Sequence, residues 1–302
     1  MWPMTGTGAP DSDPTIVETA AGPVEHVDTG TGPPVLFVHG SPGGCDQGTL
    51  MSRFLTATHR VVSLSRPGYR QTPLTDDNRT PAQQADLALA LMDALGIDRF
   101  DIVCWSGGGP STYLLAAGRP DRVGAVVALA AVSTSYEVDL RRRVGIAEEK
   151  LLMNRFGRWL TGRLTDSAPS AAVRMLLSEE GDLSRQDVKA LTAQVLEDEE
   201  QRSFAVGLFD TITGPRRAGF ANDLDQYAAL DLPLEQVAAP VLLVHARTDA
   251  DVPYEHSTHA EGRLPSARLV TLETGTHVSA WLGPDAHAVQ GSIVQHLGDH
   301  PA

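Results

Sequence analysis

Short runs of β-branched and other aliphatic residues recur along this chain, and segments with helical spacing separate them. The runs lie at residues 35–38, 61–64, 102–104, 126–129, 241–244 and 269–272. Continuous apolar strands that alternate with helices are typical of a mostly parallel sheet with helices on both faces. We therefore predict an α/β fold built on a doubly wound, mostly parallel sheet.

The clearest helical pattern between two of these runs lies at residues 81–95. The segment starts with proline, which is favoured in the first turn of a helix. Its apolar residues at helical spacing are Ala85, Leu89, Met92 and Leu95. This spacing predicts an amphipathic helix with those four side chains on its buried face.

The alternation of strand and helix stops between residues 134 and 235. No strand-like run occurs there, charged residues are more frequent, and residues 183–196 and 204–209 have helical spacing. We interpret residues 134–235 as a helical cap inserted between two strands of the sheet. Residues 15–133 and 236–302 would then form the core, and residues 1–14 a flexible polar leader.

A strand that runs straight into a Ser-Gly-Gly turn is the most specific local motif. Residues 101–110 read Asp-Ile-Val-Cys-Trp-Ser-Gly-Gly-Gly-Pro, and a helix should begin just after Ser106. A nucleophile on such a turn has a strained backbone, so the residues two before and two after it must be small. Because Cys104 and Gly108 meet this requirement, Ser106 is the candidate nucleophile. The alternative is an ordinary serine at a helix N-terminus.

A glycine-rich loop follows the strand at residues 35–38 and opens with His39. Such a loop lets a backbone N–H approach a reacting carbonyl. The helix that begins just after Ser106 directs its own free N–H groups at the same carbonyl oxygen. We assign the two oxyanion-hole donors to the backbone amides of Ser41 and Gly107. We interpret His39 as a structural support of the loop.

Two further reactive side chains each follow one of the last two predicted strands. Asp249 comes just after the strand at 241–244, and His277 just after the strand at 269–272. Open α/β sheets bind their ligands at the carboxyl ends of the strands. Ser106, Asp249 and His277 are therefore expected to meet there as nucleophile, acid and base.

The chain order Ser106, Asp249, His277, with a His-Gly loop upstream, resembles the α/β-hydrolase fold family over roughly residues 15–300. Residues 65–69 and 217–224 are also similar to members of that family. The resemblance implies that the cap shapes the substrate pocket.

One position departs from the family's Gly-x-Ser-x-Gly elbow. Cys104 stands where the family usually has glycine. We treat it as a small, buried strand residue that points away from the site. The motif is incomplete at this position, but a small side chain is sufficient there.

These residues predict a serine hydrolase that cleaves a small-molecule ester, thioester, lactone or amide through an acyl-enzyme on Ser106, without a cofactor. Carbon–carbon bond hydrolysis or acyl transfer with the same triad stays open, as does a non-catalytic ligand-binding protein of this fold. The resemblance implies that epoxide hydrolases and haloalkane dehalogenases carry a carboxylate at the elbow. Ser106 argues against both.

Three other features have a structural and a functional interpretation. Trp105, next to the nucleophile, either lines the substrate pocket or only packs beside it. Asp251 is expected to cap the helix that starts near residues 254–256 rather than to serve as the acid. Arg141, Arg142 and Arg143 are expected on a solvated face of the cap, with recognition of an anionic substrate as the alternative.

The composition of the chain restricts which binding partners and which cellular compartment we expect. The 38 acidic and 24 basic residues give a formal charge of −14, which repels nucleic acid and anionic membrane surfaces. No segment has the roughly 18–20 consecutive apolar residues that span a bilayer. Cys45 and Cys104 are not expected to form a disulfide, which fits a cytoplasmic protein. No metal site is predicted, because the only cluster considered, at residues 255–259, lacks a known ligand spacing.

Overall fold

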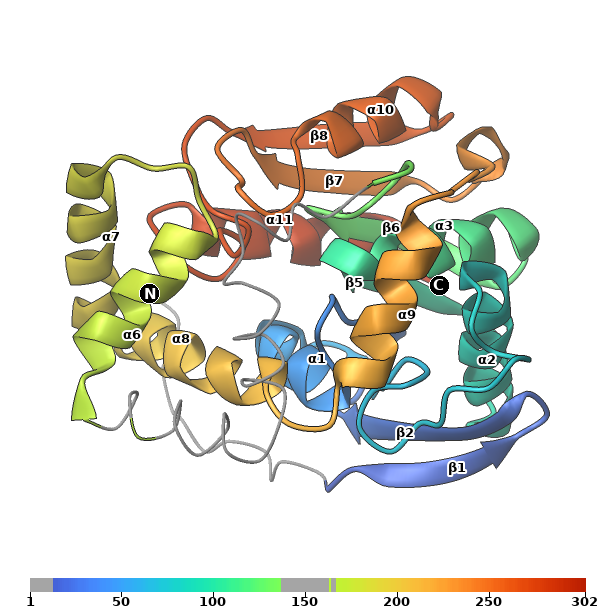
Figure 1. Cartoon of the computed structure of the whole chain (residues 1–302). Helices are drawn as coiled ribbons and strands as arrows, with labels where there is room; N and C mark the ends of the chain where they lie inside the picture. The colour runs from blue at the N-terminus through green and yellow to red at the C-terminus, as the bar shows by residue number, and fades with distance from the viewer. Residues whose placement is uncertain (1–12, 137–162, 164–166) are drawn as a thin grey trace.

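A computed structural model describes residues 13–136, 163 and 167–302, and every structural statement below concerns these residues. Within them, eight strands form one sheet in the order β1-β2-β4-β3-β5-β6-β7-β8 (Figure 1). The strands are β1 (Thr15–Thr19), β2 (Gly22–Thr29), β3 (Pro34–Val38), β4 (Arg60–Leu64), β5 (Phe100–Trp105), β6 (Val123–Leu129), β7 (Val241–Ala246) and β8 (Ala267–Leu272).

The described helices lie between the strands or after the last of them. The α-helices are α1 (Cys45–Met51), α2 (Pro81–Ala94), α3 (Gly109–Gly118), α6 (Pro169–Glu179), α7 (Arg185–Glu197), α8 (Glu199–Ile212), α9 (Arg217–Tyr227), α10 (Glu255–Arg263) and α11 (Ala286–Asp299). The short 3₁₀-helices are η1 (Arg53–Leu55), η2 (Ser106–Gly108) and η3 (Leu234–Gln236). None of the described helices is long and apolar enough to cross a membrane.

The six strands from β3 to β8 are the six predicted from the apolar runs, and neighbouring ones pair in parallel. The antiparallel hairpin of β1 and β2 was not predicted. Its sequence interrupts the apolar residues with Glu18, Glu25 and Asp28, so no continuous run marks it. Glu25 is nevertheless fully buried, and it accepts a hydrogen bond from the Ser65 hydroxyl at 2.7 Å.

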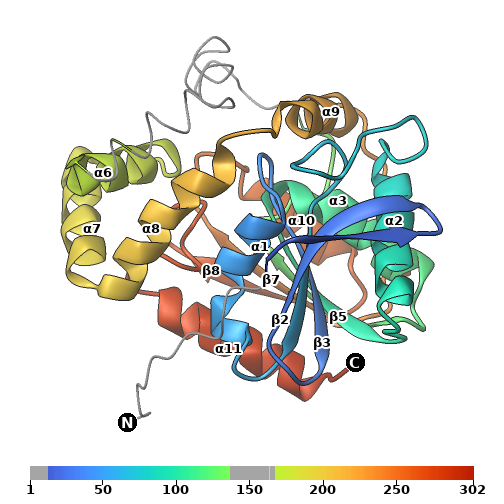
Figure 2. The same cartoon turned by 90° about the horizontal axis from the view of Figure 1, so that it is seen from below.

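Helices cover both faces of the sheet, as predicted for a doubly wound fold (Figure 2). One buried cluster packs α1 and α11 against one face. The other packs α2, α3 and α10 against the opposite face. The carboxyl ends of the central strands are therefore the part of the sheet from which loops can build a site.

Helix α2 confirms the helix predicted at 81–95, but its buried face is wider than predicted. Leu87 and Leu91 are fully buried, whereas Leu89 and Leu95 are only half-buried. The helix packs against both α3 and β1, so two separate surfaces cover it. A single amphipathic stripe underestimates the buried face of a helix with two neighbours.

Helices α6 to α9 follow β6 and precede β7, which confirms a helical insertion between two strands (Figure 1). The helices α7 and α8 correspond to the predicted helical segments at 183–196 and 204–209. The insertion packs on the core, because the Phe204 ring stacks on Trp281 with the centroids 5.6 Å apart. The cap limits 134–235 stay a prediction, and Arg141, Arg142 and Arg143 lie outside the described residues.

Candidate active site

Ser106 occupies the sharp turn between β5 and the helices η2 and α3. Its φ angle is +52°, in the left-handed region that non-glycine residues rarely adopt. The side chain is buried, with 4% of its surface exposed. Strain of this kind persists where the surrounding structure imposes it, and it is common at functional sites.

The loop that begins at His39 lies directly against this turn. A Cβ atom built on Gly107 would collide with the hydroxyl oxygens of Ser41 and Tyr227, so only glycine fits there. The N–H of Gly107 belongs to the first turn of η2, where amides have no acceptor within the helix. The two amides that we assigned as oxyanion donors therefore come from adjoining segments, beside Ser106.

His277 and Asp249 form a hydrogen-bonded pair on the loops that follow β8 and β7. Nδ1 of His277 lies 2.7 Å from Oδ2 of Asp249, and both side chains are fully buried. A carboxylate on Nδ1 fixes the tautomer that leaves the other ring nitrogen able to accept a proton. The structure thus brings together the predicted base and the predicted acid.

A second histidine, which the sequence analysis missed, also contacts this carboxylate. Nε2 of His245 lies 3.1 Å from Oδ2 of Asp249 and 2.9 Å from the carbonyl oxygen of Val252. Since both neighbours accept, Nε2 of His245 must carry a proton, and Nδ1 can then accept from the Ser257 hydroxyl at 2.8 Å. The signal was present, because His245 stands four residues before Asp249.

The Asp249 carboxylate is stabilised in its ionised form. Its other oxygen accepts the backbone N–H groups of Asp251 at 2.8 Å and Val252 at 3.0 Å. Burial alone would raise the pKa of the Asp249 carboxyl, but the attraction of His277 and the hydrogen bonds from His245 and His277 outweigh it and hold the pKa below its ordinary value. An ionised acid is the form that can stabilise an imidazolium.

The prediction that Asp251 caps the following helix is wrong. The N-cap of α10 is Tyr254, and no side chain caps that helix. The Asp251 carboxylate instead lies 3.3 Å from Nε2 of His277, although the two form no hydrogen bond. The Asp249 carboxylate accepts the Asp251 amide, which turns the loop back toward His277 before α10 begins.

Nε2 of His277 is buried and has no hydrogen-bond partner within the described part of the chain. The hydroxyl of Ser106 is therefore not bonded to it in this structure. The indole of Trp105 packs against the imidazole with ring centroids 4.8 Å apart, and its N–H donates to the His277 carbonyl at 3.1 Å. Trp105 thus packs on the base, and a contact with substrate stays a prediction.

The His39 ring supports the loop, in agreement with its structural interpretation. Its Nε2 accepts the Arg66 N–H at 2.9 Å, so Nδ1 carries the proton and donates to the Gly40 carbonyl at 2.7 Å. Burial, and then the nearby Arg66 charge, hold the pKa of His39 well below its ordinary value. A neutral His39 has both nitrogens occupied and none left for proton transfer.

A buried ion pair connects helix α9 to this loop. Arg66 and Asp223, each 2% exposed, approach to 2.7 Å. The Ser41 hydroxyl donates to Asp223 at 2.5 Å and accepts from Arg66 at 2.8 Å. The Tyr227 hydroxyl donates to the Gly107 carbonyl at 2.8 Å. Sequence reasoning flagged the segments with Arg66 and Asp223 as family-like, but it did not foresee this network or Tyr227.

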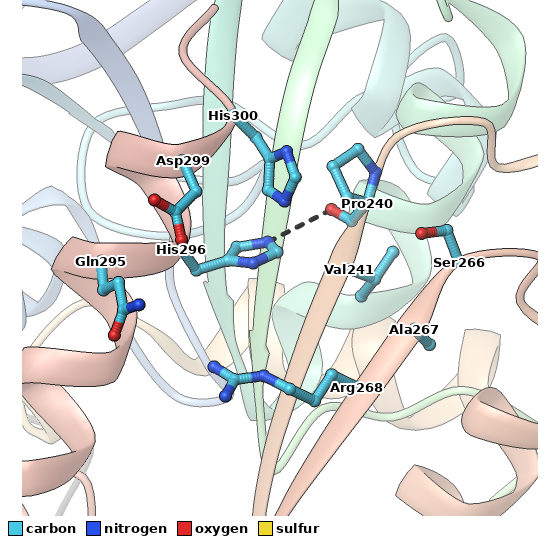
Figure 3. A pocket seen from close by; sticks show the side chains of 9 residues that line it. All are labelled: Pro240, Val241, Ser266, Ala267, Arg268, Gln295, His296, Asp299 and His300. Atoms are coloured by element: carbon cyan, nitrogen blue, oxygen red, sulfur yellow. Dashed lines mark hydrogen bonds between the residues drawn. The ribbon is translucent and has the colours of Figure 1, made fainter.

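A surface pocket of about 330 Å³ lies elsewhere on the molecule (Figure 3). Its walls include Val241 and Ala267, the first residues of β7 and β8, and His296 and His300 near the end of α11. Asp249 and His277 follow the opposite ends of these two strands. This pocket is therefore not part of the candidate active site.

Comparison with known proteins defines the class. Residues 33–284 match the family model of the alpha/beta hydrolase fold. An alpha/beta hydrolase fold protein from Nakamurella multipartita, of solved structure, is 42% identical with a TM-score of 0.88, over 94% of this chain and 99% of that one. The chain belongs to the α/β-hydrolase fold family.

Two curated relatives are more distant. The uncharacterized hydrolase YcgS of Bacillus subtilis is 28% identical over 90% of this chain and 94% of its own length. The 2-hydroxymuconate semialdehyde hydrolase of Pseudomonas putida is 26% identical over 80% of this chain and 79% of its own length. One of these relatives is itself uncharacterized, and the other is named for 2-hydroxymuconate semialdehyde.

Proposed function

We propose that this protein is a serine hydrolase that cleaves an ester, thioester, lactone or amide of a small molecule through an acyl-enzyme on Ser106. The observation that carries the proposal is the buried 2.7 Å pair of Asp249 and His277, whose imidazole packs on Trp105, the residue before a serine with a φ of +52°. A strained serine together with a fixed histidine–carboxylate pair is the arrangement that activates a hydroxyl for acyl transfer.

In the proposed first step, His277 takes the proton of Ser106 as its oxygen attacks the carbonyl carbon. The imidazolium that forms is stabilised by the ionised Asp249. The amides of Ser41 and Gly107 donate to the oxyanion, and one such donor is worth about 2.7–4 kcal/mol of transition-state stabilisation. His277 then gives its proton to the leaving group.

In the second step, His277 activates a water molecule that attacks the acyl-enzyme, and the acid is released as Ser106 regains its proton. Nε2 of His277 must face Ser106 in both steps. This nitrogen is buried and makes no hydrogen bond within the described residues, which leaves it able to accept.

Labelling with a fluorophosphonate tests the nucleophile. The wild type should react and the Ser106→Ala variant should not, and both should have the same circular dichroism spectrum. A screen of p-nitrophenyl esters, thioesters, lactones and aminoacyl amides on the same pair then identifies the preferred acyl and leaving groups. A folded wild-type protein that takes no label would indicate a non-catalytic binding protein instead.

Carbon–carbon bond hydrolysis is the second candidate, because the chain is similar to a 2-hydroxymuconate semialdehyde hydrolase. That chemistry would use the same serine and base on a ketone with a stabilised carbanion as leaving group. Turnover of a vinylogous diketone acid that exceeds turnover of every ester tested would favour it. Acyl transfer would appear as faster release of the acyl group when an alcohol or thiol acceptor is added.

A further inference from the structure

The loop between α6 and α7 lies on the two loops that carry the acid and the base (Figure 1). The backbone N–H of His277 donates to the Glu180 carbonyl at 2.8 Å. The N–H of Asp182 donates to the Thr248 carbonyl at 2.8 Å. The inserted segment is thus hydrogen-bonded to the main chain of the base itself and to the residue next to the acid.

Gly181 completes this contact. It forms an isolated antiparallel bridge with Asp249 and is buried. A Cβ atom built on Gly181 would lie 2.7 Å from the Thr276 side chain and 3.1 Å from the Gly275 carbonyl oxygen. Both atoms belong to the loop of the base, so a side chain at position 181 requires the Thr276 methyl group and the backbone at Gly275 to shift.

The two core loops are also tied to each other. The Thr248 hydroxyl donates to the Gly275 carbonyl at 2.7 Å and accepts the Gly275 N–H at 2.8 Å. Residues 180–182 are hydrogen-bonded through their backbone to both of these loops. A displacement of 180–182 therefore reaches both loops, and with them the distance between Asp249 and His277.

We propose that residues 180–182 form a positioning element, which we call the latch, that holds His277 in register with Asp249. The inference rests on the proposed function and deepens it. Residues 180–182 belong to the insertion, which was expected to select the substrate. On this proposal the insertion also sets the reactivity of Ser106 toward every substrate, including those too small to contact the cap.

Two variants test the latch at different positions. Gly181→Ala introduces the side chain for which there is no space. Asp182→Pro removes the N–H that donates to Thr248. Asp182→Ala keeps that N–H, and Gly291→Ala, on α11 with open space around its Cβ position, controls for a glycine substitution.

The first readout is the rate of Ser106 labelling by a small fluorophosphonate, together with kcat and KM for p-nitrophenyl acetate. Loss of a positioned base costs up to about 10²-fold, so Gly181→Ala should lower the labelling rate and kcat by about 30-fold. Asp182→Pro should lower them by about tenfold, the equivalent of one good hydrogen bond. KM for the acetate should change less than about threefold, because the variants affect interactions made in the transition state and not those that bind the substrate in the ground state. Both controls should behave as wild type.

The second readout is amide hydrogen exchange in a peptide that contains residues 275–278, measured without substrate. Exchange there should become faster in Gly181→Ala and Asp182→Pro and stay unchanged in both controls. If the wild type takes no label, the proposed function fails, and this exchange still decides whether the latch holds the His277 loop. Wild-type exchange and labelling in either latch variant, confirmed as folded, would overturn the proposal.

Discussion

The carboxylate of Asp251 lies 3.3 Å from Nε2 of His277, the ring nitrogen that does not face Asp249. The imidazole therefore has a carboxylate near each of its nitrogens. Only the contact with Asp249 is a hydrogen bond. In the proposed mechanism Nε2 must face Ser106, so the two aspartates have different consequences when they are changed.

We expect Asp249→Asn to lower kcat by about 10³–10⁴, because an amide cannot stabilise the imidazolium and favours the wrong tautomer. Asp251→Asn should retain kcat within about tenfold, since it removes an interaction of at most about 1.4 kcal/mol. The measurement is kcat for both variants with one activated ester. If Asp251→Asn is inactive and Asp249→Asn is nearly normal, the assignment of the acid is wrong.

Tyr227→Phe should lower kcat by no more than about tenfold, because it removes only neutral hydrogen bonds, one to the Gly107 carbonyl and one to the Ser41 hydroxyl. Burial raises the pKa of the Tyr227 hydroxyl, so it remains a donor throughout the working pH range. The expected loss is in kcat, with KM unchanged. The hydrogen bond from Tyr227 orients Gly107, whose N–H is the proposed oxyanion donor and acts in the transition state. A loss confined to KM would show that Tyr227 contacts the substrate instead.

Asp223→Ala should lower the free energy of unfolding by about 3–5 kcal/mol, because it leaves the buried Arg66 charge unpaired. The matched control is Asp28→Ala, which breaks an ion pair with Arg60 whose side chains are 35% and 30% exposed. That change should cost at most about 1 kcal/mol. Urea unfolding gives the free energy of unfolding of both variants. Equal losses would contradict a stabilising role for the buried Arg66–Asp223 pair.

The carboxyl group of Asp101 should make stability depend on pH. Burial raises its pKa to about 7, so the folded state favours the protonated form, and stability falls as the pH rises from about 4 through 7. Asp101→Asn resembles the protonated form and should be more stable than wild type at pH 8, by up to about 4 kcal/mol, but not at pH 4. Thermal unfolding of both proteins from pH 4 to pH 8 gives the difference in stability between Asp101→Asn and wild type. A difference that does not change with pH would contradict the raised pKa of Asp101.

The sequence predicted the parallel strands because each is a continuous apolar run, as in β6, where every residue is buried. It did not predict the hairpin of β1 and β2, because Glu25 lies inside a strand and only the folded structure supplies its partners. An apolar run predicts from local sequence alone that a segment is buried. Burial of a charged residue such as Glu25 can be predicted only when its partner, which is distant in sequence, is known.

The same limit applies to the site. Asp249 and His277 could be predicted because each follows a strand whose carboxyl end lies at a known edge of the sheet. Asp251 was misassigned because a carboxylate four residues before a helix can turn either toward the helix N-terminus or toward another loop, and the backbone of residues 249–254 decides between them. Tyr227 and Gly181 could not be predicted, because they reach the site from the insertion, whose placement no periodicity determines.

The latch is made of peptide groups, and this determines which changes the insertion can accept. Its hydrogen bonds come from the N–H of Asp182 and the carbonyl of Glu180, which any substituted residue other than proline would also supply. Substitutions in the helices on either side can thus reshape the cavity for new substrates while the reacting groups keep their places. A one-residue insertion or deletion within 180–182 would instead shift the Glu180 carbonyl and the Asp182 N–H relative to each other, so that both could not keep their present partners. Diversification of this enzyme, by evolution or in a library, is therefore open to replacement of side chains in the flanking helices, but not to a side chain at Gly181 or to a change of length at this loop.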